Sequence, residues 1–142
     1  MIFSAPETTA ASCLPCAPAA GVTGLQFVSD LHDCGCASEL LNSAECLEQS
    51  CLAAVQACGL TPVGNRFHQF QPAGATGVVL LAESHLAIHT WPEHRFVSLD
   101  LYVCNFGEDN TAKAERLLVS LTALFAARTP HSQRIARGSV AP

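Results

Sequence analysis

The chain has 142 residues, of which 49% are hydrophobic and 13% are charged, which suits one domain with a sizeable core and excludes global disorder. Its net charge is −5, and residues 1–65 contain no Lys or Arg, so the basic surface that nucleic-acid binding requires is absent. No run of the sequence approaches the roughly 18 consecutive apolar residues of a membrane span. The composition therefore predicts neither a nucleic-acid nor a membrane partner.

The N-terminal segment differs in composition from the rest. Residues 1–21 are rich in Ala, Pro, Ser and Thr and lack the basic and apolar regions of a secretion signal. We therefore expect a flexible leader, a single domain over residues 22–142, and a cytoplasmic location.

The eight cysteines allow two interpretations. A zinc site could be drawn from Cys13, Cys16, Cys34 and Cys36, but the second pair has one intervening residue instead of two. Because no export signal is present, we expect the cysteines to be reduced thiols and not disulfides. No metal is predicted. Three further cysteines follow a helical spacing and are interpreted as small core residues: Cys46, Cys51 and Cys58.

The first half of the domain predicts one strand and one helix. Residues 22–31 have the composition of a strand. Apolar residues then recur with helical spacing over 38–58. Ser38 is the predicted N-cap, and Gly59 is the predicted residue that follows the helix.

Four further strands follow in quick succession. They are predicted over residues 63–70, 76–82, 85–90 and 96–104, with turns at QPAG and WPEH between them. In the last strand, alternate residues share a face, which places one polar and one aliphatic set on opposite sides. The polar set is Phe96, Ser98, Asp100, Tyr102 and Cys104.

A second helix and an edge strand complete the prediction. Asp109 or Asn110 can cap the helix, which ends before Pro130, and the tail 131–142 can add an edge strand. Short strand connections and two long helices predict an α+β, two-layer sandwich, with helices packed on one face of an antiparallel sheet. We expect the other face to be apolar and to be covered by a second copy, so that the sheets dimerise.

The segment LLAESHLAIHTWPEHRF, residues 80–96, concentrates polar side chains between two apolar runs. Taken singly, Ser84, His89 and Cys104 have ordinary structural interpretations. This Ser/His/Cys set could also indicate a hydrolase, but the G-x-S-x-G elbow is absent, which weakens that hypothesis. Composition and spacing alone do not identify a reaction.

The combination AESHLAIHTWPE followed by LDLYVC closely resembles the prokaryotic short-chain S-adenosylmethionine decarboxylases, a family of pyruvoyl enzymes. The resemblance extends upstream through FHQFQPAGATGVVLLAESH and GLQFVSDLHDCG and covers about residues 24–125. It implies autocatalytic serinolysis between Glu83 and Ser84, which leaves a β chain 1–83 and an α chain 84–142. The covalent pyruvoyl cofactor would derive from Ser84 and would form a Schiff base with the substrate amine.

The resemblance also implies roles for other residues. Thr76 and His89 would support processing, His89 through proton transfer, and Cys104 would protonate the decarboxylated substrate. In substrate binding, two aromatic residues would stack on adenine and a glutamate would hold the ribose hydroxyls. These three are Phe70, Trp91 and Glu93.

The sequence departs from the family pattern at several positions. Thr76 stands where serine is usual, Gln69 replaces an arginine, Gln26 replaces a histidine, and Asn105 follows the cysteine where glycine is common. These departures leave the pyruvoyl chemistry intact but weaken the substrate assignment.

The resemblance implies decarboxylation of S-adenosylmethionine to the aminopropyl donor of spermidine synthesis. The uncovered sheet face expected above predicts a homodimer of processed protomers. Relatives that decarboxylate ornithine or arginine supply the alternative, in which Glu93 or Asp100 would hold a distal cation. An unprocessed, non-catalytic partner subunit is a further alternative. Ser84, His89 and Cys104 are all retained, which argues against it.

Overall fold

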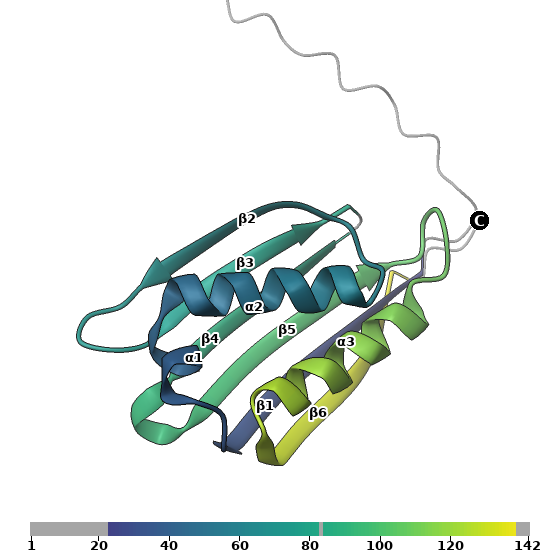
Figure 1. Cartoon of the computed structure of the whole chain (residues 1–142). Helices are drawn as coiled ribbons and strands as arrows, with labels where there is room; N and C mark the ends of the chain where they lie inside the picture. The colour runs from purple at the N-terminus through teal and green to yellow at the C-terminus, as the bar shows by residue number, and fades with distance from the viewer. Residues whose placement is uncertain (1–22, 83, 139–142) are drawn as a thin grey trace, which may run out of the picture.

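A computed structural model of the chain describes residues 23–82 and 84–138, so the predicted leader lies outside the described residues. Within these ranges a six-stranded antiparallel sheet has three α-helices on one of its faces (Figure 1). The strand order is β2–β3–β4–β5–β1–β6. The strands are β1 (Gly24–Cys34), β2 (Pro62–Gln69), β3 (Ala75–Leu81), β4 (Ser84–Trp91), β5 (Phe96–Cys104) and β6 (Ala127–Arg137). The helices are α1 (Ser38–Asn42), α2 (Ala44–Ala57), a 3-10 turn η1 (Pro92–His94) and α3 (Thr111–Leu124). The predicted two-layer α+β class is confirmed.

The first predicted helix is two helices, which corrects the single span expected over 38–58. Ser43 interrupts it with an extended backbone, and its side chain accepts a hydrogen bond from the Cys46 amide at 3.2 Å, which caps α2. The predicted cap at Ser38 is wrong because Ala37 holds that position, without a side-chain bond. Gly59 has a φ of 80° and ends the helix as expected.

The second helix and the tail follow the prediction more closely. Asn110 is the N-cap residue of α3, although its side chain makes no capping bond there. The Asp109 carboxylate instead accepts a hydrogen bond from the Thr111 amide at 2.9 Å. Hydrogen bonds from Thr111 lower the pKa of Asp109. The edge strand is present but begins at Ala127, so it includes Pro130, which an edge position tolerates.

The core lies between the helices and the face of the sheet that they cover. Alternate residues of β5 are buried as predicted, and the same alternation continues in β3, β4 and β1. Fully buried side chains from both layers include Leu31, Leu86, Ile88, Leu101, Leu47, Leu117, Leu121 and Phe125. None of the described helices is long and apolar enough to cross a membrane.

The uncovered face of the sheet, here called the open face, differs from the expectation of an apolar surface. It carries polar, charged and aromatic side chains from all six strands, with a few aliphatic ones between them. Its polar and aromatic residues include Gln26, Asp30, His32, His68, Thr76, His85, His89, Trp91, Ser98, Asp100, Tyr102 and Cys104. The expectation of an apolar face was wrong because most of the alternating polar positions of the strands fall on this side.

Candidate functional site

Ser84 begins β4, directly after the turn that joins it to β3. Leu81 and Ser84 are paired across this turn, and the Ala82 amide donates to the carbonyl of Thr61 at 3.0 Å. Side chains alternate along a strand, so Ser84 points to the same side as Leu86 and Ile88, toward the helices. The proposed cleavage position is therefore held at the end of the sheet.

Ser84 lines a small cavity of about 60 Å³ at this end, here called the Ser84 cavity. Its walls come from the α2–β2 connection, the β3–β4 turn and the beginning of α3. The lining residues are Gly59, Leu60, Thr61, Leu81, Ala82, Ser84, Glu108, Asn110 and Lys113. The cavity has walls of mixed polarity and space for a water molecule. Sequence reasoning missed Glu108, Asn110 and Lys113 because only the fold brings α3 next to the turn.

Cys104 ends β5, the neighbour of β4, at the same end of the sheet. His85 pairs with Tyr102 across these two strands, so residue 84 and Cys104 lie close along them. The Cys104 side chain belongs to the open face, whereas that of Ser84 points toward the helices. In the uncut chain, the two predicted reacting residues therefore share one end but not one face.

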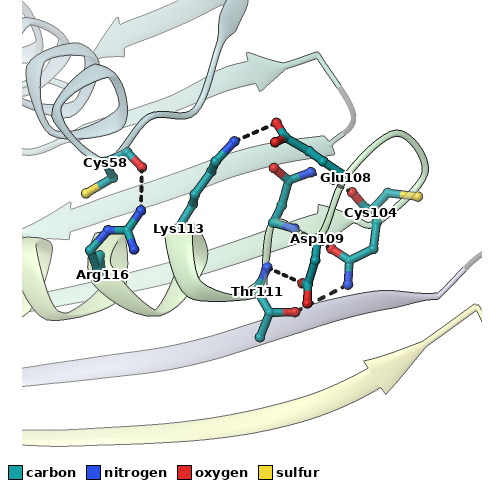
Figure 2. A network of polar contacts seen from close by, with 9 residues as sticks. Cys58, Cys104, Glu108, Asp109, Thr111, Lys113 and Arg116 are labelled. Carbon is teal, nitrogen blue, oxygen red and sulfur yellow. Dashed lines mark hydrogen bonds and ion pairs between the residues drawn. The ribbon is translucent and has the colours of Figure 1, made fainter.

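The loop after Cys104 is fixed by hydrogen bonds (Figure 2). The Asn110 side chain donates to the Cys104 carbonyl at 3.0 Å, and its backbone amide donates to the Asn105 side chain at 2.9 Å. The Asn105 amide in turn donates to the carbonyl of Thr23 at 2.9 Å. Asn105, where the family usually has glycine, thus helps to hold the backbone of Cys104 in place.

A polar network lies on the open face beside this end. Gln26 donates to both oxygens of Asp100, at 2.9 and 3.0 Å, and accepts a hydrogen bond from Arg137. His85 Nε2 lies 3.7 Å from an Asp100 oxygen. Gln26, where the family usually has histidine, therefore links a carboxylate to the guanidinium of β6. The Tyr102 ring borders this network, with the Arg137 guanidinium 5.6 Å from its centre.

Thr76 and His89 form a pair in the middle of the open face. Thr76 Oγ1 lies 2.6 Å from His89 Nδ1, and the two residues are cross-strand partners. His89 lies five positions after Ser84 along the extended strand, which corresponds to about 17 Å. The structure places Thr76 and His89 side by side, but it does not bring them to Ser84 within one chain.

The three predicted substrate-binding residues lie at the opposite end of the sheet from Ser84. Trp91 ends β4 and is 38% exposed, Phe70 follows β2 and is 44% exposed, and Glu93 lies in η1. The two aromatic rings also contact histidines, Phe70 with His68 and Trp91 with His89. Within one chain the full length of β4 separates Glu93 from residue 84.

Gln69 has a structural role that the sequence did not reveal. Its side-chain amide donates to the carbonyl of Asn42 at 2.6 Å and to that of Gly74 at 2.9 Å. Its oxygen accepts from the Ala44 amide at 2.8 Å. This residue, an arginine in the usual family pattern, therefore ties the β2–β3 turn to the junction of α1 and α2.

The described cysteines are free thiols. Cys51 and Cys58 are buried in the core, and Cys46 packs against it, as predicted. Burial raises the pKa of Cys51 to about 12 and that of Cys34 to about 11. Residues 23–82 and 84–138 contain no cluster of His, Cys, Asp or Glu that could hold a metal ion. The first cysteine pair of the alternative zinc site lies outside the described residues.

Comparison with known proteins agrees with the resemblance found in the sequence. Residues 25–138 match the family model described as S-adenosylmethionine decarboxylase. The chain is 40% identical over 98 residues to the S-adenosylmethionine decarboxylase proenzyme of Persephonella marina, covering 69% of this chain and 71% of that protein. It is 41% identical over 96 residues to the protein of the same name from Sulfurihydrogenibium sp., covering 68% and 70%.

A solved structure shows the same fold. The crystal structure of the adenosylmethionine decarboxylase from Aquifex aeolicus is 35% identical, with a TM-score of 0.75, and covers 86% of this chain and 95% of that one. A family model that spans most of the chain, relatives with 40% and 41% identity and a shared fold all agree. The chain therefore belongs to the S-adenosylmethionine decarboxylase family.

Proposed function

We propose that the chain is a proenzyme that cleaves itself between Glu83 and Ser84, and that the product decarboxylates S-adenosylmethionine. Decarboxylated S-adenosylmethionine would serve as the aminopropyl donor for spermidine synthesis. The observation that carries this proposal is the shared position of Ser84 and Cys104, which lie on neighbouring strands at one end of the sheet. A reducing, cytoplasmic location suits it, because Cys104 has to remain a free thiol.

The surroundings of Ser84 suit its conversion to a pyruvoyl group. Ser84 is the first residue of β4, so cleavage before it leaves the rest of the strand and its pairing with β5 intact. Cleavage also releases residue 84 from the turn that directs it toward the helices. We propose that the freed end then turns toward the open face, where Cys104 lies.

Once formed, the pyruvoyl group would supply a carbonyl that takes up the substrate amine and withdraws electrons as CO2 leaves. The protein residues then have two tasks in this proposal. Cys104 holds the proton that the substrate Cα takes up after CO2 has left, and its strand position fixes the direction of that transfer. Phe70 and Trp91 offer exposed aromatic faces for adenine and the sulfonium, and Glu93 accepts hydrogen bonds from ribose.

The proposal requires a homodimer of processed protomers. Within one chain His89 lies about 17 Å along the strand from Ser84, and the proposed adenine-binding residues lie farther still. Two copies packed open face to open face, with β4 antiparallel across a twofold axis, would bring His89, Trp91 and Glu93 of one to Ser84 of the other. The mixed polar and aromatic character of the open face supports such an interface, since interfaces of this kind retain polar networks.

One observation supports the alternative substrates, ornithine and arginine. The carboxylate of Asp100 lies on the open face near Cys104, is partly exposed and could pair with a distal cation. Gln26 and His85 already contact this carboxylate, however, and Arg137 lies next in the network. These contacts favour S-adenosylmethionine over the two amino acids.

The proposal is tested by measuring CO2 release by the purified protein from S-adenosylmethionine, ornithine and arginine, each labelled at the carboxyl carbon. We expect turnover of S-adenosylmethionine and little of either amino acid. Turnover of ornithine or arginine alone would contradict the substrate assignment and leave the cleavage chemistry standing. No cleavage and no turnover of any of the three would instead favour the non-catalytic partner subunit.

A further inference from the structure

The lining of the Ser84 cavity includes a cationic side chain, Lys113, to which the family resemblance assigned no role. Of the described residues that line it, Lys113 alone is basic. It extends from the first turn of α3 and is only 22% exposed, and its ammonium forms an ion pair with Glu108 at 2.5 Å (Figure 2). A Cβ at Gly59 would lie 3.8 Å from Lys113 Cε, so the stem of the side chain lies beside this glycine. The positive charge is thereby held on the helix side of the cleavage position.

Self-cleavage at residue 84, which lines the same cavity as Lys113, develops a negative charge. In the first step Ser84 Oγ attacks the carbonyl carbon of the preceding residue, the C–N bond breaks, and the nitrogen takes the hydroxyl proton, which gives an ester and an amine. In the second step a base, the imidazole of His89 from a second copy in the proposal above, takes the Cα proton. The electron pair forms a Cα–Cβ double bond, and the Cβ–O bond breaks with its electrons on the departing carboxylate. Water then hydrolyses the resulting enamine to the ketone and releases ammonia.

We propose that Lys113 acts in self-cleavage by stabilising the carboxylate that departs from Cβ of residue 84. This inference rests on the proposed function, because it assigns a group to the cleavage reaction. Ser84 points toward the helices and shares a cavity with Lys113, whereas Thr76 and His89 lie on the opposite face. A cation in a small, partly enclosed cavity interacts with a developing anion more strongly than it would in water.

The alternative is that Lys113 has only a structural role, with its ion pair tying the loop after Cys104 to α3. The two interpretations differ in what they predict for Glu108. If the ion pair is structural, Glu108→Gln and Lys113→Met should impair the protein equally. If Lys113 acts on the departing carboxylate, Glu108→Gln removes a competing anion, so cleavage should be as fast as in the wild type or faster.

The experiment follows cleavage of the full chain during cell-free synthesis, with the products separated under denaturing conditions and weighed by mass spectrometry. We expect Lys113→Met to slow the appearance of fragments 1–83 and 84–142 by about 100-fold. Lys113→Arg, which keeps the charge, should recover most of the rate. The matched control is Arg116→Met, which removes a cation one turn farther along α3 that donates to the carbonyl of Cys58 (Figure 2).

Hydroxylamine identifies the step. It cuts an ester but leaves an amide, so a chain that stalls before elimination yields fragment 84–142 with an N-terminal serine. Lys113→Met should accumulate this hydroxylamine-sensitive form. Cleavage of Lys113→Met at the wild-type rate, equal slowing by Glu108→Gln, or slowing without the ester would each overturn the inference.

Two controls keep the results distinct. Thermal unfolding of Ser84→Ala with and without Lys113→Met compares two uncut chains, and equal midpoints would exclude loss of folding as the cause of slow cleavage. A lower midpoint matched by an equal loss in Arg116→Met would contradict a specific role for Lys113. If the wild-type chain itself remains uncut, the proposed function fails; if the wild type and Lys113→Met cleave alike, only this inference fails.

Discussion

At the scale of single residues, three of the four departures from the family pattern make hydrogen bonds that the fold explains. Gln69 joins a turn to a helix junction, Gln26 links Asp100 to Arg137, and Asn105 supports the loop after Cys104. Each of these residues makes hydrogen bonds whose geometry depends on its own side-chain amide group, which the residue type usual in the family lacks. These positions therefore reflect local adaptation of the scaffold and leave the reacting residues unchanged.

The Gln69 bonds give a stability prediction. Gln69→Ala leaves the amide of Ala44 and the carbonyl of Asn42 without their side-chain partner, which should cost about 1–3 kcal/mol in the free energy of unfolding. Gln49→Ala is the matched control, since Gln49 is an exposed residue of α2. Denaturant unfolding in the uncut Ser84→Ala background measures both. Equal stability of the two variants would show that the Gln69 bonds contribute nothing.

Cys104 gives a prediction that separates cleavage from turnover. Its proposed proton transfer follows the formation of the pyruvoyl group, so Cys104→Ala should still cleave. Its kcat should fall by about 100-fold, and activity should decline further with each turnover, because protonation at the wrong carbon leaves the substrate amine attached. Progress curves and the mass of fragment 84–142 test this. A variant with normal kcat and no added mass would transfer the role to another acid.

At the scale of elements, the strands were predictable because the alternation of polar and apolar residues indicates which side of each strand is buried. In β5 the predicted polar and aliphatic sets are the two faces observed. The division of α1 from α2 could not be found in the same way, because the apolar spacing continues across Ser43. Its extended backbone and its bond to Cys46 are local features that periodicity does not reveal.

The Ser43 cap gives a prediction at this scale. Ser43→Ala removes the side chain that accepts from the Cys46 amide, so α2 should lose about 1 kcal/mol of stabilisation. Ser120→Ala, at an exposed position inside α3, serves as the control and should change little. Thermal unfolding of the two uncut chains compares them. A loss as large in Ser120→Ala would contradict a capping role for Ser43.

At the scale of the whole molecule, the candidate site divides into two groups at different places on the sheet. Sequence reasoning named the members of both groups through the family motif, but it could not show how far apart the fold places them. Residues of one sequence motif can lie far apart in space, because each residue of an extended strand adds about 3.3 Å to the length of the strand. Ser84 and Cys104 thus lie at one end, Trp91 and Glu93 at the other, with Thr76 and His89 between them. The proposed second copy of the chain would bring the two groups together.

Complementation between two inactive variants tests this arrangement. Ser84→Ala cannot be cut but retains His89, whereas His89→Ala retains Ser84. If the pair acts across a dimer, co-expression should produce cut His89→Ala chains, although each variant alone remains uncut. Light scattering should show dimers in every sample. Mixed dimers that leave His89→Ala uncut would place its processing partner within the same chain.

The most direct test of the central claim is the mass of the purified protein under denaturing conditions, with and without S-adenosylmethionine and cyanoborohydride. We predict two fragments, 1–83 and a blocked 84–142, and a gain of mass by 84–142 alone when substrate and reductant are both present. Ser84→Ala should remain a single chain of unchanged mass. A wild-type protein that stays uncut, or a fragment 84–142 that S-adenosylmethionine leaves unmodified, would contradict the account.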